Sequence, residues 1–553
     1  MGLVIRALPD YHSLFCNKGM NKFFITTAID YPNGSPHIGH AYEKVLADII
    51  ARYRRLRGDE VFFLTGVDQH GQKMQQTADQ EGVNVATLAT RNTRKFIALW
   101  EKLGVHYDGW AATTDELHKK CVQEILATLH DEGQLYKKAY KGFYSVRQEQ
   151  YLTEKDRGED GQFGEEWGEV VELEEENWYF RLSEHAEWLK SAVTSGALGI
   201  LPEFRRAEVL NAIERASETD LCISRPKDRL HWGIELPFDT GFVTYVWFDA
   251  LINYISFAGY RSDEASSLPD FDTLWPANAH VIGKDILVPA HAIYWPCMLR
   301  AMGFADDQMP MLLVHGWWNI RKKTAGPEED DSEEKMSKSL GNVVDPAELA
   351  ERFGVDAVRY YLVRDIVTGK DSAFDLDRLI SLFNSELAND LGNLLNRSIN
   401  MTKRFVGGEL AEPNYDDDAC KDVRSSLEDA NKAYLAAMDA FDLPGALKAI
   451  NSHVVRCNQF IEKNPPFELR KDDSQADRVS AILYHLCESC LHLSILLSPF
   501  LPDASAKIRG QLRAEQSFTG HLEDLSWGLL KAGHQTGKAK PVFPRILLEE
   551  DQT

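Results

Sequence analysis

The segment YPNGSPHIGH, residues Tyr31 to His40, constrains the fold more than any other part of the chain. It follows a β-branched and aromatic run, Phe23 to Ile29, that predicts a strand. Its first half is rich in turn residues, and from Tyr42 to Tyr53 the apolar residues recur at helical spacing. A second predicted strand covers Val61 to Thr65. Strand, helix and strand in this order predict one βαβ unit of a parallel sheet.

Two histidines, His37 and His40, stand where the predicted helix begins. Ligands of parallel sheets bind at the carboxyl ends of the strands, and backbone N–H groups at a helix N-terminus attract phosphate. A histidine pair at this spacing could also bind a metal, or cap the helix and pack. The position favours an anion site.

A second signal is the basic segment KMSKS, Lys335 to Ser339. Alone it could be a solvated loop. Combined with the histidines and with Gly39, which allows a flat ring to approach the backbone, it predicts a nucleotide site.

The composition limits the function classes. A chain of 553 residues predicts two or three domains, and 44% apolar with 26% charged residues is typical of a globular protein. We find neither an uncharged apolar run of about 18 residues nor a signal peptide, so we expect no membrane segment and a cytoplasmic location. A formal charge of −24 argues against general nucleic-acid affinity, although it leaves room for a local basic strip.

The eight cysteines are too few for a disulfide framework and fit a reducing compartment. Cys487 and Cys490 form the single C-x-x-C pair. They lie in a predicted helix without a second pair, so we favour core packing over zinc there. Residues 1–19 carry no clear pattern, and Met20 is an alternative start directly before the first strand.

PHIGH and KMSKSLGN, in this order, resemble the two signatures of the class I aminoacyl-tRNA synthetases. Within that class the runs TTAIDYPNGSPHIGHAYE, GVDQHGQK, YVWFDALINY, IGKDI, HAIYWP and LVHGWW are most similar to the methionyl-tRNA synthetase family. The resemblance implies a Rossmann-type α/β catalytic domain with a parallel sheet and an inserted connective domain, followed by an all-α anticodon-binding helical bundle.

The resemblance also implies domain boundaries. We expect a weakly ordered extension at 1–19 and a catalytic domain at 20–120 and 236–320, interrupted by a connective domain at 121–235. A KMSKS loop with a stem-contact region is expected at 321–373, the bundle at 374–530 and a return segment at 531–553. The connective range holds only Cys121 and Cys222, so we predict that it lacks zinc. The mixed-charge loop before KMSKS is read as a solvated hairpin tip.

The reaction implied is activation of methionine by ATP with Mg²⁺, followed by transfer to tRNA. The implied catalytic residues are His37, His40, Lys335 and Lys338, and the ATP-binding set adds Pro36, Gly39 and Ser337. Asp68 is the expected partner of the methionine ammonium group. The implied methionine-binding residues are Ile29, Tyr31, Asp68, Trp247, Leu251, Tyr254, His291 and Trp295. Two departures lie beside this set: one extra residue before His291, and leucine at 251 where some members have proline.

On the predicted bundle, Asn393 and Arg397 lie one helical turn apart and match the base-contacting pair of the family. Phe467 occupies a place where tryptophan is common, so stacking on a base is possible with less surface. The resemblance implies initiator and elongator methionine tRNAs as partners and, since no appended domain follows, a monomer. Two alternatives stay open: a paralogue that keeps the fold without aminoacylation, and a small nucleotidylyltransferase, which would need no helical bundle.

Overall fold

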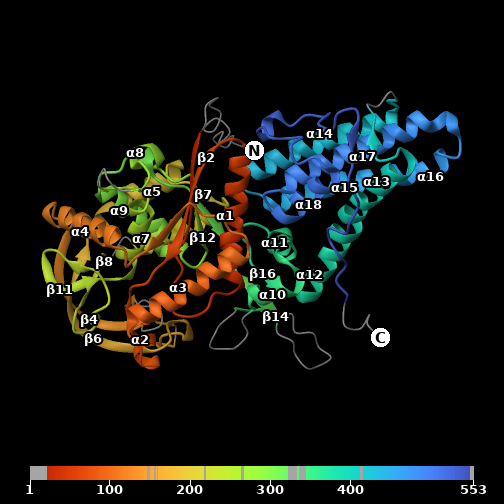
Figure 1. Ribbon diagram of the computed structural model, residues 1–553. Helices are drawn as coiled ribbons and strands as arrows, with labels where there is room; N and C mark the ends of the chain where they lie inside the picture. The colour runs from red at the N-terminus through yellow and green to blue at the C-terminus, as the bar shows by residue number, and fades with distance from the viewer. Residues whose placement is uncertain are drawn as a thin grey trace, which may run out of the picture.

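The computed structural model describes residues 21–145, 150–152, 154, 157–158, 160–216, 219–262, 267–321, 333–335, 344–411 and 415–547. The prediction of a weakly ordered extension before Met20 lies outside these residues. Figure 1 shows two bodies side by side, an α/β body formed by the first part of the chain and a helical body formed by the last.

The α/β body is built on a six-stranded sheet in which all neighbouring strands pair in parallel. Its order is β3 (Gly109–Ala112), β2 (Glu60–Val67), β1 (Lys22–Thr27), β12 (Ala279–Gly283), β13 (Leu312–His315) and β7 (Ile200–Leu201). β1 and β12 are buried almost throughout, as expected for parallel strands that helices cover on both faces. The predicted βαβ unit is present as β1, α1 (Ile38–Leu56) and β2.

Side chains of β1 alternate between two separate apolar cores. Phe23 and Ile25 point into the core that contains α1 and α3 (Val85–Lys102). Phe24 points into the other core, which contains α4 (Glu116–Asp131), α7 (Val246–Ser256) and α9 (Trp295–Ala301). The sheet therefore separates two helical layers, and residues at the carboxyl ends of its strands lie at the shared edge.

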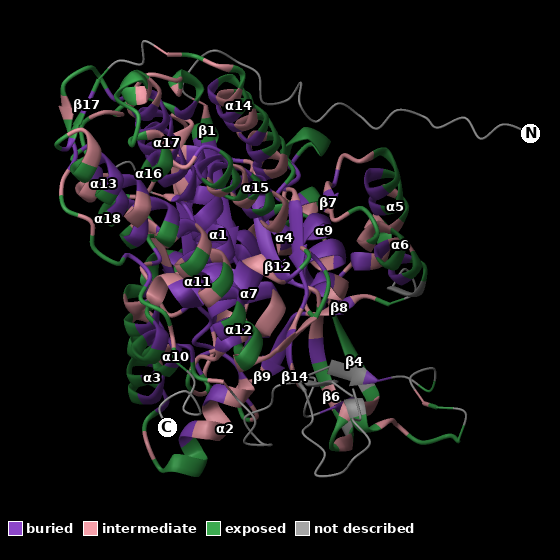
Figure 2. Ribbon diagram, turned by 90° about the vertical axis from the view of Figure 1, so that its right-hand side faces the viewer, coloured by how far each residue is buried: buried purple, intermediate pink, exposed green. Residues whose placement is uncertain are grey.

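The segment predicted as a connective domain divides into parts with different partners. The long antiparallel strands β4 (Leu135–Ser145) and β6 (Val170–Phe180) pair along their whole length and project from the body (Figure 2). They form a four-stranded sheet with β5 (Gln150–Leu152) and β8 (Leu221–Cys222), beside a second sheet of β9 (Ser224–Pro226), β10 (Glu235–Leu236) and β11 (Asp239–Thr244). Between β6 and β8 the chain returns to the α/β body: α5 (Ala186–Ser195) leads into β7, which joins the main sheet, and α6 (Arg205–Ala216) follows.

A small sheet of β14 (Trp318–Arg321), β15 (Glu333–Lys335) and β16 (Ser372–Phe374), with α10 (Pro346–Phe353) and α11 (Val355–Arg364), leads to the bundle. α12 (Leu376–Leu382) and a π-helical segment (Phe383–Gly392) then run directly into α13. The bundle helices are α13 (Asn393–Phe405), α14 (Asp418–Asp439), α15 (Leu443–Lys463), α16 (Pro466–Leu469), α17 (Ala476–Leu497) and α18 (Pro502–Leu512).

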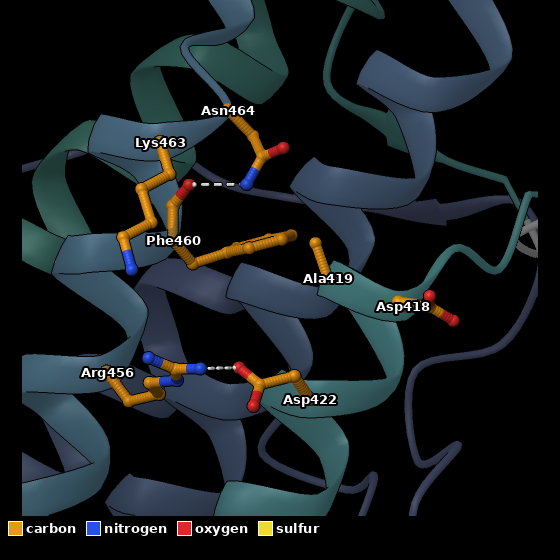
Figure 3. A pocket seen from close by; sticks show the side chains of 7 residues that line it. All are labelled: Asp418, Ala419, Asp422, Arg456, Phe460, Lys463 and Asn464. Carbon is orange, nitrogen blue, oxygen red and sulfur yellow. Dashed lines mark hydrogen bonds and ion pairs between the residues drawn. The ribbon is translucent and has the colours of Figure 1, made fainter.

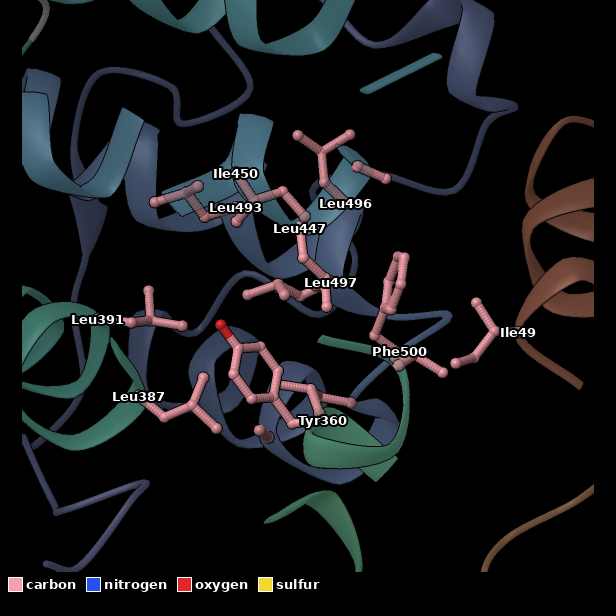
Figure 4. Close-up of a cluster of buried hydrophobic side chains, with 14 of the residues drawn as sticks. Ile49, Tyr360, Leu387, Leu391, Leu447, Ile450, Leu493, Leu496, Leu497 and Phe500 are labelled. Carbon is pink, nitrogen blue, oxygen red and sulfur yellow. The ribbon is translucent and has the colours of Figure 1, made fainter. Parts of the chain in front are cut away.

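The two bodies share one apolar core at their junction. Figure 4 shows Phe500 of the bundle between Ile49 of α1 and the cluster that holds Leu447 and Leu497, with Tyr360 of α11 below Leu497. Beside it the fully buried Arg359 donates to Asp48 of α1 at 2.7 Å and to the backbone carbonyl of Phe500 at 2.9 Å. The helix that carries both histidines at its start is thus fixed to this junction through Asp48 and Ile49.

Within the described residues one helical stretch, Asp473–Leu497, is long and apolar enough to cross a membrane. Its apolar window is 94% buried inside the structure, because α13, α14, α15 and α18 pack around it. This stretch is therefore the central helix of the bundle. Cys487 and Cys490 are both buried within it, as the packing interpretation expects.

Candidate functional site

The two histidines form the N-terminal cap of α1. Nδ1 of His37 accepts from the N–H of Gly39, Nδ1 of His40 accepts from the N–H of His37, and both distances are 3.1 Å. A neutral imidazole that accepts at Nδ1 carries its proton at Nε2. Each ring therefore presents an Nε2–H donor at the positive end of a helix, which suits a phosphate oxygen.

Two glycines make room for aromatic side chains at this edge. A Cβ on Gly39 would lie 3.0 Å from the ring of His37. The flat ring that Gly39 admits close to the backbone is therefore the imidazole of His37. Gly71, with φ of +99°, would place a Cβ 2.1 Å from the hydroxyl of Tyr31. This hydroxyl instead donates to the carbonyl of His70 at 2.8 Å. Glycine at 71 is required by both the backbone conformation and the space.

Asp68 follows β2 and lies beside this edge, 4% exposed. Its carboxylate accepts from the hydroxyl of Thr113 at 3.1 Å and from the N–H of His70 at 3.2 Å. Burial, with the negative charge of Asp249 nearby, raises the pKa of Asp68 to about 7. An ammonium group is the partner that would hold this carboxylate in its charged form.

The predicted methionine pocket is assembled around Tyr254, which is 1% exposed. Its hydroxyl lies 2.8 Å from Nε2 of His291, while Nδ1 of His291 lies 2.8 Å from the carbonyl of Ile286. Burial lowers the pKa of His291 to about 4, so the ring is neutral at pH 7. It then donates from Nδ1 to Ile286, and Nε2 accepts the hydroxyl proton of Tyr254.

The remaining predicted pocket residues surround this pair. Trp295 is fully buried with its ring centroid 5.8 Å from that of Tyr254, and Leu251 is 1% exposed in the same helix as Tyr254. Trp247 at the start of α7 and Ile29 after β1 are half-buried and pack against the same core. The extra residue before His291 lies within a π-helical turn, Leu287–Tyr294, that still brings His291 to Tyr254.

The chain just after the second signature, KMSKSLGN, is hydrogen-bonded to the turn that carries the histidines. The N–H of Ile38, between His37 and Gly39, donates to the carbonyl of Val344 at 3.3 Å. Val344 is the second residue after KMSKSLGN in the sequence. Lys335 ends β15, paired with Asn319 of β14. Ser337 and Lys338 lie outside the described residues, whereas Pro36 is half-buried in the turn before α1.

The predicted base-contacting residues lie at two ends of α13: Asn393 and Arg397 near its start, and Phe467 beside Phe405, its last residue. Asn393 is exposed at the start of α13 and Arg397 is half-buried one turn later. Phe467 is 47% exposed on α16, its ring against that of Phe405 and under the guanidinium of Arg404 at 5.2 Å.

A cavity of about 280 Å³ opens in the bundle, between α14 and α15. An ion pair between Arg456 and Asp422 crosses it, and Phe460 forms part of its wall (Figure 3). None of the three predicted base-contacting residues lines this cavity.

Three buried histidines around the site went unpredicted. His70 and His118 both contact Asp249, and His280 stacks on Tyr254 with ring centroids 4.2 Å apart. Each partner lies far away in the chain, so no local spacing could indicate the contact. A fully buried lysine, Lys44, also went unpredicted, although its place in α1 beside the histidines was a usable signal; it donates to Asp30, next to Tyr31.

Comparison with known proteins decides the family. Residues 23–161 and 167–399 match the family described as tRNA synthetases class I (M), and residues 413–553 match the anticodon binding domain of methionyl tRNA ligase. The chain belongs to the methionyl-tRNA synthetases. It is therefore a class I aminoacyl-tRNA synthetase, and the predictions of a Rossmann-type catalytic domain and a helical anticodon-binding bundle are confirmed.

The relatives cover almost the whole chain. The methionine–tRNA ligase of Fusobacterium nucleatum is 36% identical over 536 residues, which is 96% of this chain and 81% of the relative. That of Thermotoga maritima is 37% identical over 529 residues, covering 95% and 80%. The structure of Mycobacterium tuberculosis methionyl-tRNA synthetase in complex with methionyl-adenylate is 34% identical, with a TM-score of 0.85, and covers 95% of this chain and 100% of that one.

Proposed function

We propose that this methionyl-tRNA synthetase activates methionine with ATP at the edge formed by β1, α1 and β2, and then transfers it to tRNA. The observation that carries the proposal is the hydrogen bond from Ile38 to Val344. It joins the histidine turn to a residue five positions after KMSKS, although the two are far apart in sequence. Both signatures therefore act on one nucleotide.

On the ATP side, the Nε2–H groups of His37 and His40 bind oxygens of the α-phosphate, and Lys335 and Lys338 bind the pyrophosphate. Pro36 and Gly39 shape the turn, and Ser337 adds a hydroxyl. The methionine carboxylate is ionised at pH 7 and attacks the α-phosphate directly, which displaces pyrophosphate. These residues supply alignment and charge stabilisation, and no protein base is required.

On the methionine side, the carboxylate of Asp68 binds the ammonium group beside Tyr31. The thioether packs among Trp247, Tyr254 and Trp295, since sulfur is polarizable and packs well on aromatic rings. Because the Tyr254 proton is donated to His291, the aromatic faces provide most of the attraction. Ile29 and Leu251 close the apolar wall.

Magnesium enters this reaction with the phosphates of ATP. Among the described residues no group of three or more histidine, cysteine or acidic side chains is placed to hold a metal ion. Absence of zinc from the connective strands stays a prediction, and metal analysis of the purified protein tests it: one stoichiometric zinc would contradict it.

For the second step, Asn393 and Arg397 read anticodon bases by hydrogen bonds, and Phe467 stacks on one. We propose initiator and elongator methionine tRNAs as substrates and the cytoplasm as the location. We also propose that the protein is a monomer. Light scattering of the purified protein tests the monomer.

The decisive experiment measures exchange between pyrophosphate and ATP with several amino acids, followed by charging of initiator and elongator methionine tRNAs. We expect exchange with methionine and charging of both tRNAs. Exchange with isoleucine or leucine but none with methionine would contradict the methionine assignment. Exchange without charging would point to a paralogue that has lost aminoacylation.

A further inference from the structure

A chain of buried polar side chains runs from the end of α7, through α4, to the proposed methionine side of the site. It begins at Ser256, whose hydroxyl lies 2.8 Å from Nδ1 of His118. Nε2 of His118 lies 2.9 Å from one oxygen of Asp249, and the other oxygen lies 2.7 Å from Nδ1 of His70. His118 is 0% exposed, Asp249 2% and His70 6%. The groups come from α4, from α7 and from the loop after β2.

The chemistry of these groups gives the chain a direction. A carboxylate only accepts, so both imidazoles donate to Asp249, His118 from Nε2 and His70 from Nδ1. The hydroxyl of Ser256 lies next to Nδ1 of His118 and donates to the carbonyl of Asn253 at 3.4 Å. Burial alone would raise the pKa of Asp249, but the charge of His70 and the N–H donors of both histidines lower it to about 2. Asp249 is therefore a buried anion that both histidines satisfy.

His70 links this anion to the two groups expected to meet the methionine backbone. Its N–H donates to the carboxylate of Asp68 at 3.2 Å, and its carbonyl accepts from the hydroxyl of Tyr31 at 2.8 Å. The peptide groups of His70 thus lie between Asp68 and Tyr31. Because Asp249 holds the imidazole of His70 at Nδ1, the backbone of His70 has less freedom to rotate.

We propose that His118 and Asp249 are positioning residues for methionine: Asp249 holds the imidazoles of His118 and His70, and His70 sets the relative placement of Asp68 and Tyr31. The proposal rests on the proposed function of Asp68 and Tyr31. His118 and Asp249 reach methionine through His70 and touch no substrate themselves. The alternative is a polar pair that only joins α4 to α7.

The test compares two substitutions of similar size, H118Q and H118M. The amide nitrogen of glutamine occupies about the place of Nε2 and can donate to Asp249, whereas methionine fills the space without a donor. We expect H118M to raise the KM for methionine at least about tenfold and to leave the KM for ATP within about twofold. H118Q should keep the KM for methionine within about threefold of the natural protein.

H485M is the matched control. His485 is also fully buried and hydrogen-bonded, to the carbonyl of Ala481, but it lies in α17 of the bundle. Its replacement should lower the melting temperature without changing the KM for methionine. Equal KM values for methionine in H118M and the natural protein would overturn the proposal, as would equal increases in H118M and H118Q.

A second variant covers the case in which H118M does not fold. D249N keeps the shape of the side chain but places an amide N–H against one of the two imidazole donors. It should raise the KM for methionine about tenfold, and an unchanged KM would also overturn the proposal. Absence of methionine-dependent exchange in the natural protein would instead contradict the proposed function, so the two failures can be distinguished.

Discussion

In the proposed methionine pocket, Tyr254, His291 and Trp295 are each at most 2% exposed, whereas Phe467 at the end of the bundle is 47% exposed. The pocket side chains are tied to one another by hydrogen bonds, such as the one between Tyr254 and His291. Asn393, at the other site, is exposed to solvent. On the proposed assignment, methionine meets enclosed side chains, and tRNA meets an open surface.

This difference has a physical reason. Methionine differs from leucine or isoleucine mainly in shape and in one sulfur, and an apolar pocket distinguishes such ligands only if its walls are held rigidly. Bases of a single-stranded loop can be splayed onto a surface and recognised by their edges and faces. A substitution in the pocket should therefore disturb many contacts at once. A substitution on the bundle surface should remove only one contact with tRNA.

The largest effect should come from D68N. Removing the charge leaves the methionine ammonium group without a buried partner, a loss of about 3 to 5 kcal/mol that corresponds to at least about a hundredfold in kcat/KM for methionine. Pyrophosphate exchange at varied methionine concentration measures it. The KM for ATP should stay within about twofold. A loss below about threefold would show that another group binds the ammonium.

R397A should affect only the tRNA step. A hydrogen bond from a charged group contributes about 1.5 to 3 kcal/mol, so kcat/KM for tRNA charging should fall about 10- to 100-fold while exchange stays unchanged. R300A is the control, since Arg300 lies on α9 of the catalytic body with Asp306. If R397A slowed exchange as well, the two sites would be coupled through the junction of α1 and α11.

The methionine site should also depend on pH more strongly than the bundle. With the pKa of Asp68 near 7, its carboxylate is mostly charged at pH 7.5 and mostly protonated at pH 6. Methionine must then displace a proton, so its KM should rise about eightfold as the pH falls between these values. Asp249 keeps its charge over this range. In D68N the KM should be flat, and a falling KM at lower pH in the natural protein would contradict the assignment.

Sequence reasoning predicted those parts of the fold and of the site that have a local sequence signal. The βαβ unit follows from periodicity, and His37, Asp68 and Tyr254 lie in recognisable runs. β7 is only two residues long, which is too short to show a strand pattern. The sequence therefore predicts it as part of the connective domain, whereas it pairs with β13 in the main sheet. The contact between His118 and Asp249 joins residues 131 positions apart, so it depends on the tertiary fold alone.

The smallest effect should come from Phe467, and it bears most directly on the contrast between the two sites. Its ring contacts Phe405 edge-on and lies under Arg404, and the residue stays 47% exposed, so part of it is open to a base. Stacking by a single ring contributes about 1 kcal/mol at the lower end of the usual range, so F467A should raise the KM for tRNA about fivefold. F467W, with a larger ring, should lower it about twofold.

Both variants should show unchanged methionine exchange and melting temperature, because an exposed ring contributes little to the core. If F467A instead lowered the melting temperature by several degrees, Phe467 would be part of the bundle core, and this contrast would hold only for Asn393 and Arg397.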